Sequence, residues 1–143
     1  MTQIKIICFE STDGAGKSSV IAALNKKSKY KYICIDRFLG SSFCYRRNKE
    51  EDLLKAESIL ANLDKKYIKF YLVYLYCSNN RILIKRLQSK KDEDKIKYIK
   101  RDKKRYKKYL SKTKFDSIAI NTSYEEIDKT VDRIIKFVEE AKI

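Results

Sequence analysis

Short apolar runs alternate along the chain with longer stretches in which apolar side chains recur every three to four residues. The short runs are typical of strands, and the longer spacing is typical of a helix with one buried face. Strands are expected at 4–9, 30–36, 70–76 and 115–120, and loop chemistry at 37–47. Helices are expected from 17 onward, at 49–67, from 79 or 80 to 87, up to about 110, and from 122 or 123 onward. Because a helix separates each strand from the next, this order favours an α/β fold: three layers, α/β/α, around a four-stranded parallel sheet.

A short loop joins the first strand to the first helix and reads Ser-Thr-Asp-Gly-Ala-Gly-Lys-Ser-Ser over residues 11–19. It matches the phosphate-loop pattern G-x-x-x-x-G-K-[S/T] except at Ser11, where the pattern has glycine. Backbone N–H groups of residues 14–18 can converge on one concavity, to which the helix N-terminus adds partial positive charge. The alternative is an ordinary strand-turn-helix with an accidental Gly-Lys-Ser. The strand before and the helix after favour a phosphate site.

Four side chains near the ends of the first two strands suit nucleotide chemistry. In the loop, Lys17 can neutralise the β- and γ-phosphates and the Ser18 hydroxyl can ligate Mg²⁺. The second strand ends at Asp36, a carboxylate suited to the Mg²⁺ shell, and Arg37 follows as a clamp for a substrate phosphate. The alternative for Arg37 is a sheet-edge side chain paired with a surface acid.

Charge and composition limit the classes of protein to which this chain can belong. The 143 residues are expected to form one domain, 1–143, with a net charge of +15. Lysine outnumbers arginine 26 to 8. Such an excess indicates the codon bias of an AT-rich genome more than a polyanion surface, which would favour arginine. Nucleic acid is therefore the less favoured partner, although the charge does not exclude it.

Cysteine and histidine usage argues against a zinc site. The four cysteines form no C-x-x-C pair and the chain has no histidine, so buried reduced thiols are expected rather than a zinc site. The apolar runs are too short to span a membrane, and no signal peptide is visible. The expected location is the cytoplasm, with no membrane partner.

Two motifs together resemble thymidylate kinases. The first is Phe9-Glu10-x-x-Asp13-Gly14-Ala15-Gly16-Lys17-Ser18, and the second is Asp36-Arg37-Phe38-x-x-Ser41-Ser42-x-x-Tyr45. The stretch from Tyr74 to Glu93 is similar to that family's strand leading into a lid, here at 88–95. Short virus-encoded proteins of this type share the compact layout. The resemblance implies a P-loop fold with a small basic lid.

The resemblance also implies an activity and a set of site residues. The implied activity is ATP-dependent phosphoryl transfer to a deoxynucleoside monophosphate, dTMP preferred, in nucleotide biosynthesis; a homodimer is compatible with it. Implied catalytic residues are Lys17, Arg37, Arg86, Lys90 and Lys91, with the last three closing over the transferred group. Implied nucleotide-binding residues are Asp13, Gly14, Ala15, Gly16, Lys17, Ser18, Ser19 and, near the adenine, Asn121; implied Mg²⁺ ligands are Ser18 and Asp36.

The chain also departs from that family. It contains no proline, so the family's phenylalanine-arginine-proline substrate motif is absent, and the acceptor pocket must draw on residues 38–67. The alternatives are a deoxynucleoside kinase, whose strand-end motif is Glu-Arg-Ser, and a nucleotide-binding or nucleic-acid-associated P-loop ATPase without acceptor chemistry. The charged segment 88–95 can equally be a solvated surface turn.

Overall fold

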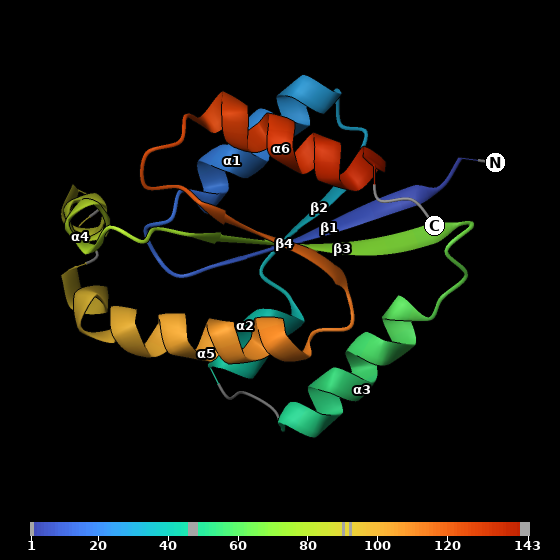
Figure 1. Ribbon diagram of the computed structural model, residues 1–143, viewed down its shortest axis with the longest axis horizontal. Helices are drawn as coiled ribbons and strands as arrows, with labels where there is room; N and C mark the ends of the chain where they lie inside the picture. Colours follow the sequence, from blue (N-terminus) through green and yellow to red (C-terminus); the bar gives the residue numbers. More distant parts are fainter. Residues whose placement is uncertain (1, 46–48, 90, 92, 141–143) are drawn as a thin grey trace.

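The computed structural model describes residues 2–45, 49–89, 91 and 93–140 (Figure 1). Its strands are β1 (Ile4–Ser11), β2 (Ile33–Asp36), β3 (Ile68–Tyr76) and β4 (Asp116–Asn121). Its helices are α1 (Lys17–Ser28), α2 (Leu39–Cys44), α3 (Glu50–Ala61), α4 (Asn80–Ser89), the 3₁₀ helix η1 (Glu93–Tyr98), α5 (Ile99–Lys112) and α6 (Ile127–Glu140).

The four strands form one parallel sheet in the order β2-β1-β3-β4. The α/β fold and its four-stranded parallel sheet are as the sequence predicted. The chain passes from β1 outward to β2 and then returns to β3 on the other side of β1. The connections therefore diverge at the carboxyl end of β1, which is where ligands bind in open α/β sheets.

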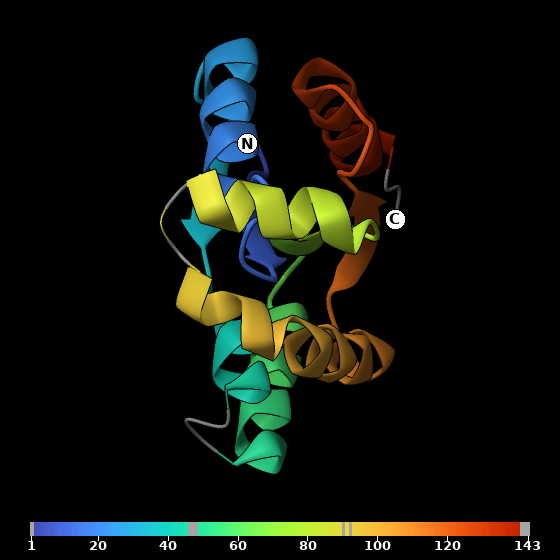
Figure 2. The same cartoon turned by 90° about the vertical axis from the view of Figure 1, so that its left-hand side faces the viewer.

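Helices cover both faces of the sheet (Figure 1). Helices α1 and α6 pack on one face, and α2, α3 and α5 lie on the other. The first face buries Phe9, Leu24 and Ile134, and the second buries Leu72, Tyr106 and Tyr109. Helix α4 crosses the carboxyl ends of the strands, in front of the sheet in Figure 2. Its apolar side chains form a third cluster that brings α4 against the loop after β1.

Several element boundaries differ from the sequence prediction. Within 37–47, where a loop was expected, Leu39–Cys44 forms a short helix that buries Phe43 and Cys44. The helix expected at 49–67 ends at Ala61, and the second strand begins at 33 rather than 30. Tyr30 has a φ of 59°, a left-handed conformation that a strand does not accommodate.

The N-terminal cap expected for α4 is confirmed, whereas the cap expected for the last helix, α6, is wrong. The Asn79 side chain accepts hydrogen bonds from the backbone N–H groups of Arg81 and Ile82, at 3.0 and 3.2 Å, and so begins α4. The last helix begins at Ile127 rather than after Thr122 or Ser123. Those two side chains are buried and bond elsewhere: Thr122 Oγ1 donates to the Ala15 carbonyl over 2.8 Å, and Ser123 Oγ accepts from the Asn79 N–H over 3.1 Å.

The cysteines are free thiols, and three of the four are buried. Burial raises the pKa of Cys8 to about 12, so this thiol is protonated at neutral pH. Within the described ranges, no helix combines the length and the apolar character needed to cross a bilayer.

Candidate active site

The loop after β1 depends on two glycines with positive φ. Gly14 and Gly16 have φ of 82° and 83°, and Gly16 directly precedes α1. A Cβ on Gly14 would lie 2.7 Å from Leu83 Cδ1 on α4, whereas a Cβ on Gly16 would meet nothing within 4 Å. Gly14 is thus required for both backbone conformation and packing against α4, and Gly16 for conformation alone.

Ser11, which departs from the phosphate-loop pattern, lies in regular strand structure. It is the last residue of β1 and pairs with Leu75 of β3. Its φ is not positive, so a side chain at this position causes no backbone strain. The substitution of serine for glycine is therefore compatible with the loop geometry.

A cavity of about 440 Å³ lies over this loop, lined by residues 11–18 together with Asp36 and Arg37. Among the described residues, the buried Thr12 Oγ1 has no hydrogen-bond partner. A buried hydroxyl without a partner is costly, and a ligand oxygen in the adjoining cavity can supply one. With the glycine-shaped loop, this orphaned group fits a bound phosphate.

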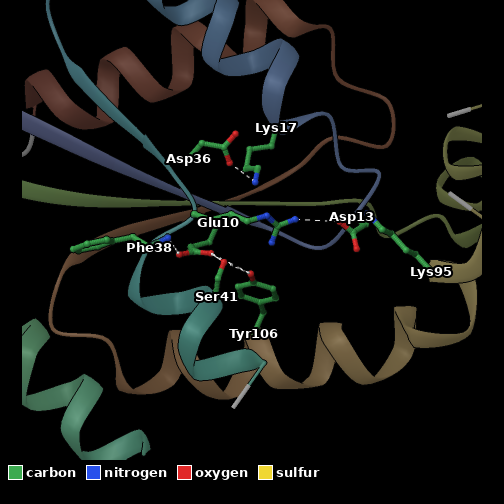
Figure 3. A network of polar contacts seen from close by, with 9 residues as sticks. Glu10, Asp13, Lys17, Asp36, Phe38, Ser41, Lys95 and Tyr106 are labelled. Atoms are coloured by element: carbon green, nitrogen blue, oxygen red, sulfur yellow. Dashed lines mark hydrogen bonds and ion pairs between the residues drawn. The ribbon is translucent and has the colours of Figure 1, made fainter. Parts of the chain in front are cut away.

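Lys17 and Asp36 meet in this cavity as an ion pair (Figure 3). Burial lowers the pKa of Lys17 below its ordinary 10.5, while the hydrogen bond to Asp36 opposes that shift. Ser18 is exposed and lines the same cavity, which places a hydroxyl and the Asp36 carboxylate at one site. Over the described ranges, no group of three or more acidic, cysteine or histidine side chains could hold a metal by itself. Mg²⁺ commonly takes only one or two protein ligands plus phosphate oxygens, so these two residues fit a shared site.

Arg37 stands at the boundary between this cavity and a second one. Its φ is 66°, a strained conformation for a non-glycine residue, and its N–H donates to the Phe9 carbonyl over 3.0 Å. Its Nη2 donates to Asp13 Oδ1 over 3.1 Å, and Lys95 Nζ lies 3.8 Å from the same oxygen. Asp13, Arg37 and Lys95 all line the second cavity, of about 470 Å³.

The second cavity combines residues from three parts of the chain. Its lining consists of Asp13, Arg37, Phe38, Ser41, Ser42, Tyr45, Lys95, Tyr98, Arg101 and Asp102. The motif residues up to Tyr45 were expected here from the sequence. The contributions of η1 and α5 were missed, because they follow the second motif by about 50 residues and no short motif marks them.

A buried carboxylate holds the wall of this second cavity in place. Glu10 accepts hydrogen bonds from the Phe38 N–H at 2.7 Å, from Ser41 Oγ at 2.6 Å and from the Tyr106 hydroxyl at 3.1 Å (Figure 3). Burial, and secondarily the charge of Glu10, raises the pKa of Tyr106, so its hydroxyl stays protonated. Glu10 thereby joins β1 to α2 and α5.

The structure places Arg86 behind the phosphate loop rather than over its cavity. Its Nη1 donates to the Gly14 carbonyl over 3.3 Å and to Thr122 Oγ1 over 3.2 Å, and its Nη2 donates to the Thr122 carbonyl over 2.8 Å. Arg86 lines a third cavity of about 240 Å³, together with Ser19 and Ile127. These bonds fix the loop to α4 and to the end of β4.

Two other residues expected of the lid and the adenine site, Lys91 and Asn121, do not line the phosphate-loop cavity. Lys91 is exposed and is not among the residues lining the cavities described above, and Lys90 lies outside the described residues. Asn121 lines a cavity of about 400 Å³ beside α6. Its side-chain oxygen accepts from the N–H groups of Ser78 and Ser123, at 3.2 and 3.0 Å, so the amide is held in one orientation.

No protein-family model matches the sequence, and neither does any curated protein. Solved structures resemble the fold. One is the YorR protein of Bacillus subtilis in complex with phosphorylated GDP, with a TM-score of 0.72, 24% identity, and coverage of 94% of this chain and 95% of that one. Another is deoxyadenosine kinase from M. mycoides with bound dATP, with a TM-score of 0.57, 14% identity, and coverage of 94% and 99%. At these identities the likeness shows a shared fold.

Proposed function

We propose that this chain transfers a phosphoryl group from ATP to a deoxynucleoside monophosphate, with dTMP as the preferred acceptor. One observation carries the proposal: the phosphate-loop cavity and the second cavity share Asp13 and Arg37. Two adjoining sites with a common cation can align a donor phosphate with an acceptor phosphate. Alignment and positive charge supply most of the acceleration of phosphoryl transfer.

On the donor side, the loop residues Gly14 to Ser18 would hold the ATP phosphates, and Lys17 would contact the β- and γ-phosphates. Ser18 and Asp36 would hold Mg²⁺, which supplies neutralising charge on the phosphate oxygens when bound. The adenine would lie along the third cavity, between Arg86 and Ile127. Arg86 would then act through the loop, by holding the Gly14 carbonyl, rather than on the transferred group.

On the acceptor side, the charges of the second cavity favour an anion. Its lining includes the cations of Arg37, Lys95 and Arg101 against the carboxylates of Asp13 and Asp102. Arg37 would bind the acceptor phosphate at the shared boundary. The aromatic rings of Phe38, Tyr45 and Tyr98 in the same lining offer surfaces for a sugar and a base.

A phosphate acceptor also suits a site in which Asp13 and Asp102, the carboxylates that line the second cavity, already pair with arginines. A monophosphate oxygen that attacks the γ-phosphorus is already ionised at neutral pH, and ADP leaves with the electron pair of the broken bond. A nucleoside hydroxyl would instead gain from a carboxylate base. Glu10 is buried and already accepts from Phe38, Ser41 and Tyr106.

A deoxynucleoside kinase is the second candidate, and the fold shared with deoxyadenosine kinase favours it. The bound phosphorylated GDP in YorR, by contrast, supports a nucleotide ligand. An acceptor panel separates the two: ADP formation from Mg-ATP is measured with each deoxynucleoside and each deoxynucleoside monophosphate. We expect the highest kcat/KM with dTMP. Faster transfer to nucleosides would favour a deoxynucleoside kinase. If ADP is released at a rate that no acceptor increases, the protein is a P-loop ATPase without acceptor chemistry.

A further inference from the structure

The positive charge of this chain is concentrated in one segment. Residues 95–114 hold eleven of the 34 lysine and arginine side chains but one of the 19 aspartate and glutamate side chains. This seventh of the chain therefore carries +10 of the net charge of +15. Codon bias alone would spread lysines along the sequence, so it does not explain this segregation.

Helix α5 displays three of these lysines on its exposed face. Its buried side holds Ile99, Tyr106 and Tyr109. The exposed side carries Lys100, Lys104 and Lys107, whose spacing of three to four residues aligns them in a stripe. The stripe from Lys100 to Lys107 is about 10 Å long at 1.5 Å per residue.

The stripe lysines have no counter-charges in the described part of the chain. Lys100, Lys104 and Lys107 take part in none of its ion pairs or side-chain hydrogen bonds, whereas the neighbouring Lys108 pairs with Glu50 over 3.1 Å. Like charges three and four residues apart on a helix repel one another. These lysines repel one another, and no acidic side chain of the described residues offsets the repulsion. Such a face is suited to bind an external polyanion.

We propose that the lysine stripe of α5 binds the phosphate backbone of a nucleic acid. Charge complementarity identifies the partner: a strand presents regularly spaced phosphates, and lysines along a helix can neutralise several at once. A membrane surface fits less well, because an interfacial helix needs an exposed apolar face, and the apolar face of α5 is buried in the protein. The stripe lies outside the phosphate-loop and second cavities, so this binding is separate from phosphoryl transfer.

The test compares two triple variants that each remove three charges. The first is Lys100→Gln/Lys104→Gln/Lys107→Gln. The control is Lys26→Gln/Lys55→Gln/Lys136→Gln, three exposed lysines on α1, α3 and α6. Fluorescence anisotropy with a labelled single-stranded DNA, the same sequence as RNA, and the DNA duplex gives affinities at several salt concentrations. Circular dichroism confirms that both variants fold.

We expect the stripe variant to lose at least tenfold in affinity for the single strands, and the control less than threefold. The slope of log K against log[salt] should become shallower by about 2 in the stripe variant, since each lost phosphate contact removes about 0.7. Equal losses in the two variants, or no salt-dependent binding by the wild type, would overturn the proposal. Binding to phosphatidylserine-containing vesicles or to polyglutamate as tight as to nucleic acid would overturn it as well. Phosphoryl transfer should be unchanged in both variants. If the wild type shows no phosphoryl transfer, that result would contradict the proposed function and not the proposed nucleic-acid binding.

Discussion

Lys17 and Asp36 form an ion pair that joins the first residue of α1 to the last residue of β2. The Lys17 side chain is 9% exposed, whereas that of Asp36 is 51% exposed, so the cation is held inside the cavity and the carboxylate reaches solvent. A triphosphate bound in the loop would take over Lys17 and release Asp36. The pair therefore keeps both groups oriented toward the place where the phosphates and the metal would sit.

Replacing Lys17 by alanine should abolish most phosphoryl transfer without unfolding the protein. The loss of a charge-assisted contact to the β- and γ-phosphates should cost about 3 to 5 kcal/mol of transition-state stabilisation. Asp36 is half exposed, so leaving it unpaired should change the free energy of unfolding by only about 1 kcal/mol or less. Steady-state kinetics and urea denaturation measure the two effects. Activity within tenfold of wild type would contradict the phosphate-loop interpretation.

Substitutions of Asp36 and Arg37 should have different effects: the first should change the dependence of the rate on Mg²⁺, and the second should change the KM for the acceptor. Asp36→Asn should raise the Mg²⁺ concentration needed for half-maximal rate, because a neutral amide is a weaker ligand. Arg37→Ala should mainly raise the KM for the monophosphate, since its guanidinium lies between the two cavities. Initial rates over magnesium and acceptor titrations distinguish them. If both variants behave like the wild type, Asp36 and Arg37 have only a structural role.

The phosphate loop was predictable from the sequence because its chemistry is local. Nine consecutive residues fix the glycines with positive φ, the lysine and the helix start, and the strand before them is apolar. Asp36 could be placed for a similar reason, since parallel strands bring their carboxyl ends to one edge. Periodicity also predicted the sheet, although not Leu39–Cys44, whose short helix forms around the Glu10–Ser41 hydrogen bond.

The remainder of the candidate site depends on tertiary packing that no short motif encodes. Lys95 and Arg101 reach the second cavity only because η1 and the first turn of α5 lie near the carboxyl ends of the strands, below α4 in Figure 2. Arg86, expected over the transferred group, bonds instead to Gly14 and Thr122, because α4 lies against the back of the loop. The resemblance to thymidylate kinases implied a role for Arg86 at the site but not the direction of its side chain.

Arg86→Gln should weaken ATP binding and destabilise the fold together. The variant loses hydrogen bonds to the Gly14 and Thr122 carbonyls, which should cost about 1–3 kcal/mol in the free energy of unfolding. The KM for ATP should rise because the loop is held less firmly. Arg81→Gln is the matched control, since Arg81 is an exposed α4 residue whose side chain makes no hydrogen bond to the described residues. A stable variant with reduced kcat alone would instead favour a direct role on the transferred phosphoryl group.

The attachment of α6 to the sheet should depend on pH through Glu139. Its carboxylate accepts from Lys31 Nζ at 2.7 Å and Lys5 Nζ at 2.8 Å, and also from the Tyr32 hydroxyl. These bonds, chiefly that from Lys31, lower the pKa of Glu139 from 4.5 to about 2.

Because the pKa of Glu139 is lower in the folded state than in the unfolded state, its contribution to stability is fully present above about pH 4.5 and is lost as the pH falls toward 2. Glu139→Gln should therefore lower the urea midpoint at pH 7, and its difference from wild type should shrink as the pH falls from 4.5 toward 2. Glu140→Gln, an exposed neighbour without an ion pair in the described part of the chain, should show no such difference. A difference between Glu139→Gln and wild type that stays constant from pH 7 down to the acid-unfolding range would show that these bonds do not depend on the charge of the carboxylate.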